Sequence, residues 1–337
     1  MIKLKSISTI SNRGMTLTEV MLSVIILCII TPGLVMLMTS MTKGFTGYEA
    51  GVNLRQLNQV ALNQMYLRVG SNKRIFGNNT NDIAYLNKIS LTGNPALLTG
   101  SLLPTVEDTG TLTPGTTNFL SSSVGNSLFF ANNDTSLEVL TGTNTTRVDI
   151  FRFNYYYLTS VNPKSISSAS SYRLVQWRSV QFADYEELAN ITNLTRQSNV
   201  IKALGSSKIT YAWDYDNTNA SSAFYTLSST TGLITASPSL MLPQYECNVL
   251  TTLITNLILG GYGYGVSANS AGWAQAPKTV PLYATASSAF PSGFEVAVCG
   301  NSAGRQVLLR CVLVAQGSMP DIVADDMQVV ATCRDLW

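Results

Sequence analysis

The hydrophobic residues of this chain are concentrated at its N-terminus, directly behind a short polar segment. Residues 1–14 carry Lys3, Lys5 and Arg13 and no acidic residue. The next 27 residues, from Met15 to Met41, are almost entirely apolar. As a helix, a run of this length spans roughly 40 Å, which is enough to cross the hydrocarbon core of a bilayer. The pattern predicts a transmembrane helix over 15–41 behind a basic leader.

A secretory signal peptide is the alternative interpretation of this segment. The apolar region of a signal peptide has about 7 to 15 residues and ends at a cleavage site made of small residues. The apolar run seen here is about twice that length, which favours a retained membrane helix.

The helical period continues beyond the apolar run, at Phe45, Tyr48, Val52, Leu57, Ala61, Met65 and Val69. This spacing predicts that the helix extends through an amphipathic part, 42–70, with one face buried. Pro32 and Gly33 lie inside the apolar run. Because proline has no amide hydrogen, we expect this pair to kink or loosen the helix locally.

From residue 71 to 337 the pattern changes to short apolar runs separated by Asn, Gly, Ser, Thr and Pro, which is typical of strands and turns. The strands predicted by aromatic and β-branched content are 127–131, 148–158, 172–182, 209–213, 224–227 and a hairpin of 294–299 with 306–315. Helices are predicted near 185–193 and 248–259, and long surface loops over most of 90–147. The fold class is therefore α+β, with a long helical spine packed on a β-rich head.

Composition limits the chemistry that this head can perform. The chain has 21 Lys+Arg, 19 Asp+Glu and no histidine, and only 12% of its residues are charged. The missing histidine excludes Ser-His-Asp and Cys-His catalysis and any histidine-containing zinc site. A net charge of +2 provides no basic face for nucleic acid. We therefore expect neither an enzyme nor a nucleic-acid-binding protein.

Glu19 is the anomaly of the apolar run, because a lone carboxylate inside a membrane helix is costly. Cleavage between Gly14 and Met15 would create an ammonium group four residues before it. On a neighbouring copy of the chain, that ammonium could neutralise the Glu19 carboxylate.

Arg13-Gly14, followed by Met15-Thr16-Leu17-Thr18-Glu19-Val20 and the apolar run, resembles the prepilin leader of type IV pilins and of type II secretion pseudopilins. The resemblance covers about residues 9–41. It implies that a prepilin peptidase cleaves after Gly14, that Met15 becomes the methylated N-terminus, and that Glu19 aligns subunits during assembly. Met15 stands where phenylalanine is commonest in that family. The resemblance also implies a helix that partly melts at Pro32-Gly33 when subunits pack.

The resemblance to pilins further implies a pilin fold with large insertions and a structural role. The chain would be a subunit, of the large minor kind, of a type IV pilus or a type II secretion pseudopilus. Its partners would be other pilin or pseudopilin subunits, the prepilin peptidase, an inner-membrane assembly platform and the lipid bilayer. It would reside in a bacterial inner membrane with its head in the periplasm, and then in a filament. The alternative function is a filament-tip adhesin or a substrate-binding subunit that uses the large head.

Four cysteines lie in the last 91 residues, Cys247, Cys299, Cys311 and Cys333, and a fifth, Cys28, lies in the apolar run. An even number in a head outside the cytoplasm predicts two disulfides. Three pairings are possible, of which we favour Cys299 with Cys311 and Cys247 with Cys333. A zinc site made of all four cysteines is the alternative, and the absence of a CxxC pair argues against it.

Several oxygen-rich segments are candidate sites. Asp214 to Asn219 alternates oxygen ligands as a calcium loop would, but it lacks the glycine and the distal glutamate of an EF-hand, so a plain turn is favoured. Asp321, Asp325 and Asp326 are interpreted as a solvated acidic loop. The pairs Glu186-Glu187 and Glu107-Asp108 are interpreted as loop charges rather than catalytic carboxylates. No metal or other cofactor is expected, with calcium as a weak alternative.

Overall fold

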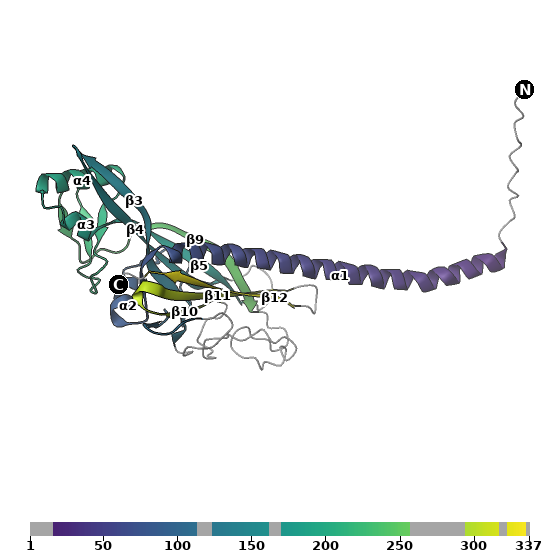
Figure 1. Ribbon diagram of the computed structural model, residues 1–337. Helices are drawn as coiled ribbons and strands as arrows, with labels where there is room; N and C mark the ends of the chain where they lie inside the picture. The colour runs from purple at the N-terminus through teal and green to yellow at the C-terminus, as the bar shows by residue number, and fades with distance from the viewer. Residues whose placement is uncertain (1–15, 113–122, 162–169, 257–293, 317–321, 335–337) are drawn as a thin grey trace, which may run out of the picture.

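A single long helix projects from a β-rich head in the computed structural model of this protein (Figure 1). The structure describes residues 16–112, 123–161, 170–256, 294–316 and 322–334. Helix α1 runs without a break from Leu17 to Gly70. The predicted α+β class is confirmed, with the apolar helix first and the β-rich head after it.

The head is built mainly from strands, with a few short helices between them. The strands are β1 (Asn72–Phe76), β2 (Val106–Glu107), β3 (Leu128–Thr141), β4 (Asn144–Val161), β5 (Ser170–Asp184), β6 (Tyr211–Trp213), β7 (Phe224–Leu227), β8 (Ile234–Ala236), β9 (Gln244–Asn256), β10 (Phe294–Cys299), β11 (Arg305–Gln316) and β12 (Ile322–Cys333). The helices are α2 (Thr80–Leu86), α3 (Tyr185–Ala189), α4 (Leu194–Ser206) and the 3₁₀ turn η3 (Ser302–Gly304).

These strands form two sheets. The larger has eight strands in the order β1-β3-β4-β5-β6-β7-β8, with β9 pairing along another part of β5. The smaller has four, in the order β12-β11-β10-β2. The β3–β4 hairpin closes between Thr141 and Asn144, and Gly142 in its turn has φ +66°. Glycine adopts that left-handed conformation without a Cβ penalty, which fixes the register of the hairpin.

The C-terminal part of α1 packs on the core formed by the two sheets. Its buried residues are Asn58, Ala61, Leu62, Met65 and Val69. They recur at the helical period, so they form one face. That face meets residues of both sheets, including Leu128, Phe130, Leu174, Val307 and Leu309. The helix is thus an integral part of the head over its last turns.

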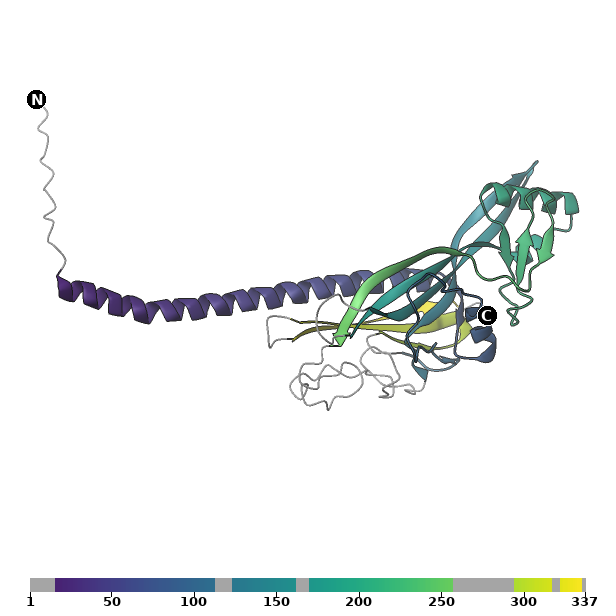
Figure 2. The same cartoon turned by 180° about the vertical axis from the view of Figure 1, so that it is seen from behind.

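A second group of elements extends the far end of the head. Strands β5 and β9 are antiparallel neighbours, yet the chain between them, residues 185–243, makes a long excursion through α3, α4 and β6 to β8. We call this excursion the distal unit. Its own core contains Leu188, Val200, Ile201 and Leu204 packed on Val148 and Ile150 of β4. Figures 1 and 2 place it at the end of the molecule opposite the N-terminus of α1.

Three predictions about local structure are wrong. The segment predicted as a helix over 248–259 is strand β9 up to Asn256, because its β-branched residues pair with β5. The loops predicted over 90–147 include most of β3 and the start of β4, which pair with each other. Asp325 and Asp326 lie in β12 rather than in a solvated loop, and Asp326 is ion-paired with Arg310 at 2.8 Å. Asp321 lies outside the described residues.

The predicted disulfides are also wrong, since the structure joins none of the five cysteines in a disulfide. In the β10–β11 hairpin, Cys299 is opposite Gln306 and Cys311 is opposite Phe294. The two cysteines are therefore about five residues, or roughly 17 Å, apart along the strands, whereas a disulfide needs Cα atoms within about 7 Å. Cys247 belongs to the larger sheet, opposite Trp177, and Cys333 to the smaller, opposite Arg305.

Candidate functional site

The first half of α1 is the most unusual surface of the molecule. The residues from Leu17 to Phe45 make the one helix of the described residues that is long and apolar enough to cross a membrane. None of that stretch is buried within the chain. Its large apolar side chains are open on every side; Leu27, for example, is 67% exposed. A surface of this kind is stable only within a lipid bilayer or against other apolar surfaces.

Glu19 takes part in the cap at the N-terminal end of α1. The Thr16 amide donates to Glu19 Oε2 at 2.9 Å, and the Thr16 hydroxyl donates to the same oxygen at 3.0 Å. In return, the Glu19 amide donates to Thr16 Oγ1 at 3.4 Å. This reciprocal pair is a capping box, which satisfies free donors at the start of the helix. Both residues are exposed, and the pattern Thr-x-x-Glu is visible in the sequence.

The carboxylate of Glu19 therefore does not need a distant partner in order to be hydrogen-bonded. Its charge, however, is still uncompensated by any cation in this contact. Both members of the capping box follow the predicted cleavage point, so removal of the leader would leave it intact. Gly14 and Met15 themselves lie outside the described residues.

Pro32 and Gly33 lie within the exposed half of α1. The helix continues through both residues, and Figure 1 shows a gentle curve rather than a break. Proline cannot donate to the Cys28 carbonyl four residues earlier, so one helical hydrogen bond is missing here. An added Cβ at Gly33 would meet no atom within 4 Å. Local melting of this segment during assembly stays a prediction.

A polar contact holds the other half of α1 on the head. Asn58, which is fully buried, donates from Nδ2 to the Cys311 carbonyl at 3.1 Å and to Asp325 Oδ2 at 2.8 Å. The neighbouring Asp326 accepts from Arg310, which also pairs with the buried Glu295. These bonds connect one helix position to β11 and β12, so they fix where α1 sits along the smaller sheet.

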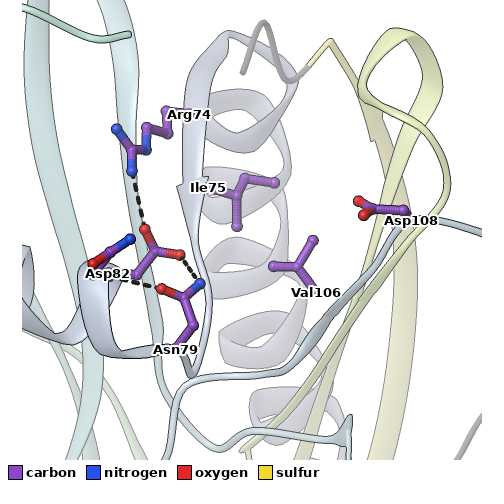
Figure 3. Close-up of a pocket in the computed structure, with 7 residues that line it drawn as sticks. Arg74, Ile75, Asn79, Asp82, Val106 and Asp108 are labelled. Carbon is purple, nitrogen blue, oxygen red and sulfur yellow. Dashed lines mark hydrogen bonds and ion pairs between the residues drawn. The ribbon is translucent and has the colours of Figure 1, made fainter. Parts of the chain in front are cut away.

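A small polar pocket of about 300 Å³ opens between β1, α2 and β2 (Figure 3). Arg74, buried at its wall, pairs with Asp82 at 3.1 Å and donates to the carbonyls of Tyr215 and Asn217. Asp82 in turn accepts from the Gly77 amide and from Asn79. These bonds tie the wall residues to one another, and Arg74 also stacks on Phe76 and Tyr85. The pocket is thus a structural junction.

The candidate calcium loop is a turn in the structure. Asn217 accepts through Oδ1 from the Asn219 amide and donates to Asp214, and the Asn217 amide donates to the Asp214 carbonyl at 3.3 Å. Within the described residues no group of three or more Cys, Asp or Glu is arranged to hold a metal ion. Glu107 accepts from the Ser123 hydroxyl and Asp108 pairs with Arg305.

Three cysteines of the head lie largely among apolar neighbours. Burial raises the pKa of Cys311, of Cys299 and of Cys247, and for each of them burial is the largest cause. Because the thiolate is the reactive form, these three groups are poor nucleophiles.

Comparisons with models of protein families, with curated proteins and with solved structures gave no match to this chain.

Proposed function

We propose that this protein is a structural subunit of a type IV pilus or of a type II secretion pseudopilus. It is inserted in the inner membrane of a bacterium through the first half of α1, with its head in the periplasm, and polymerises through that same half of the helix. It acts by packing, not by catalysis, and it needs no cofactor. The observation that carries the proposal is the fully exposed apolar helix Leu17–Phe45.

The size of the apolar surface supports two successive environments for the helix. At 1.5 Å per residue, 29 residues extend roughly 44 Å, which exceeds the hydrocarbon thickness of a bilayer. The head covers none of this surface. Either lipid or a surrounding set of apolar helices can cover this surface. The helix therefore loses no apolar contact when it moves from the bilayer to the filament.

Glu19 supplies the direction of assembly in this proposal. Its charge lies in the first turn of the helix, within the apolar surface. The methylated ammonium group of Met15 on a neighbouring subunit is the partner that would neutralise it. Other subunits, the prepilin peptidase that cuts after Gly14 and an assembly platform in the inner membrane complete the set of partners.

Two substitutions at Glu19 separate its charge from its capping role. Glu19→Gln keeps the capping box, because glutamine serves at that position as glutamate does, whereas Glu19→Ala removes both. We expect both variants to insert normally and to be lost from sheared filaments at native expression levels. Glu49→Gln, on the exposed surface of α1 outside the membrane-spanning part, is the matched control and should be incorporated.

Normal incorporation of Glu19→Gln would contradict the role of the charge. A second readout tests processing: mass spectrometry of the assembled protein should find a methylated Met15 at its N-terminus. An intact Met1 in filaments would refute the cleavage.

A filament-tip binding subunit is the second candidate function. The distal unit favours it, because it lies at the end of the head farthest from the membrane helix (Figure 2). It also exposes large apolar side chains at Leu194 and Leu233, 77% and 62% accessible. Labelling of intact filaments with an antibody to the head should place it only at one end if this candidate is correct.

A further inference from the structure

Carboxylates gather where the distal unit meets strands β4 and β5. Asp184 ends β5 and caps α3, and Glu186 and Glu187 occupy the first turn of α3. The neighbouring elements add Asp149 of β4 and, after β6, Asp214 and Asp216. The positive charges facing the same cluster are Lys73 of β1 and Arg147 of β4. Six carboxylates therefore meet two cations at this joint, which we call the carboxylate joint.

Asp184 occupies the innermost position of the carboxylate joint and is only 4% exposed. Its Oδ1 accepts from the amides of Glu186 at 2.9 Å and of Glu187 at 3.4 Å. Both donors are neutral backbone groups, and they compensate a buried charge less well than a cation would.

The other members of the joint tie the distal unit to the sheet. Glu187 Oε2 accepts from the Asp149 amide at 2.6 Å, which connects α3 to β4. The Tyr215 hydroxyl donates to Glu186 at 3.2 Å, and Lys73 Nζ lies 3.6 Å from the centre of the Tyr215 ring. The Lys73 ammonium thus lies over an aromatic ring, and the carboxylates of Glu187 and Glu186 accept from a neutral amide and a neutral hydroxyl donor.

We propose that the carboxylate joint is a contact between the distal unit and the rest of the head whose strength depends on its protonation. Uptake of a proton at Asp184 removes the innermost negative charge and relieves its repulsion with Glu187. The distal unit is then held more tightly in mildly acidic medium and opens more readily in neutral or alkaline medium. The stability of the contact between the distal unit and the rest of the head therefore depends on pH.

The direction of the effect follows from the titration of Asp184. Burial, followed by the charge of Glu187, raises the pKa of Asp184 from 3.8 to about 7. Burial also raises the pKa of Glu187, of Asp214 and of Asp216. A carboxyl group whose pKa is higher in the folded state binds more protons there than when unfolded. The contribution of the Asp184 carboxyl group to the stability of the folded head is therefore greatest below about pH 4, falls as the pH rises, and is lowest above about pH 7.

Hydrogen exchange on the full-length protein in detergent micelles tests the proposal. After correction for intrinsic rates, the opening constant of amides in α3 and β6 should fall roughly 10-fold between pH 8 and pH 6, as expected for one group with a pKa near 7. Amides of β10 and β11, which lie outside the distal unit, serve as the internal reference. Equal opening of α3 at the two pH values would overturn the proposal.

Three variants assign the effect to its residues. Asp184→Asn keeps an acceptor for the cap but cannot titrate, so its opening constant should vary less than about twofold over this range. Glu138→Gln, an exposed carboxylate on the neighbouring β3, should keep the full dependence. If Asp184→Asn folds poorly, Glu187→Gln provides the test. Removal of the Glu187 charge should lower the pKa of Asp184 and so move the midpoint of the pH dependence to lower pH. A full dependence in Asp184→Asn, or an unmoved midpoint in Glu187→Gln, would contradict the proposal.

Discussion

The N-terminal half of α1 and its C-terminal half belong to one unbroken helix but have different surroundings. From Leu17 to Phe45 the helix is not buried within the chain, whereas Met65 and Val69 near its other end are fully buried. The head therefore stabilises only the second half. The first half must find its apolar contacts outside the chain.

Cysteine reactivity gives the largest expected difference between the two halves. Cys28 is exposed on the first half, while Cys311 lies under the second half, where Asn58 binds its carbonyl. We expect a lipophilic maleimide to label Cys28 of the micelle-bound protein while the head is still folded. Cys311 should remain unlabelled until the head unfolds, because it is buried and its pKa is raised by that burial. Peptide mass spectrometry reads both sites in one sample.

The same sample tests the state of the other thiols. After denaturation without a reductant, all five cysteines should carry the label, because the structure joins none of them in a disulfide. Fewer than five would mean that a disulfide forms in the protein, and rapid labelling of Cys311 in the folded protein would break the contrast between the two halves.

A truncation in each half of α1 gives the next largest effect. Met65→Ala should lower the free energy of unfolding of the head by about 2–5 kcal/mol, because it leaves a cavity in the core shared by the helix and both sheets. Leu27→Ala is the matched control and should change it by less than about 0.5 kcal/mol. The buried Trp177 and Trp213 report unfolding by fluorescence in urea. Equal losses in both variants would show that the first half also packs on the head.

The polar contact of Asn58 should give a smaller effect. Asn58→Ala leaves Asp325 and the Cys311 carbonyl without this donor, which should cost about 1–3 kcal/mol. Asn63→Ala, one and a half turns further along on the exposed face, should cost less than about 0.5 kcal/mol. The same urea titration measures both. A loss in Asn63→Ala as large as that in Asn58→Ala would refute the assigned face.

Elements with a strong periodic pattern could be predicted from the sequence. The spine ends at Gly70, and the hairpin strands 294–299 and 306–315 are β10 and β11 within one residue. Their signals are local, since an apolar period or a turn between two apolar runs needs no other part of the chain. The signal of the capping box is equally local, in Thr16 and Glu19, but the interpretation of Glu19 as a lone charge in a membrane helix conceals it.

Features that depend on distant contacts could not be predicted in this way. Strand β3 contains Asn132, Asn133 and Asp134, which have low strand propensity, and it is held by Arg152 and Arg178 on β4 and β5. The wrong disulfides have the same origin, because an even count of cysteines does not reveal their register. The carboxylate joint likewise brings together residues from four separate segments of the chain.

Loss of the helix cap should give the smallest effect and should fall on the first half alone. Thr16→Ala removes the hydroxyl that accepts from the Glu19 amide, so the first turn of α1 should lose about 0.5–2 kcal/mol of local stability. Amide exchange at Leu17 to Val20 in micelles should then increase, while the urea midpoint of the head stays unchanged. Thr39→Ala is the control, because its hydroxyl binds the Val35 carbonyl in the middle of the helix and caps nothing. Equally fast exchange at the first turn in the control would show that the effect is not specific to the cap, and a lower head stability in Thr16→Ala would show that the two halves of α1 are coupled along the helix.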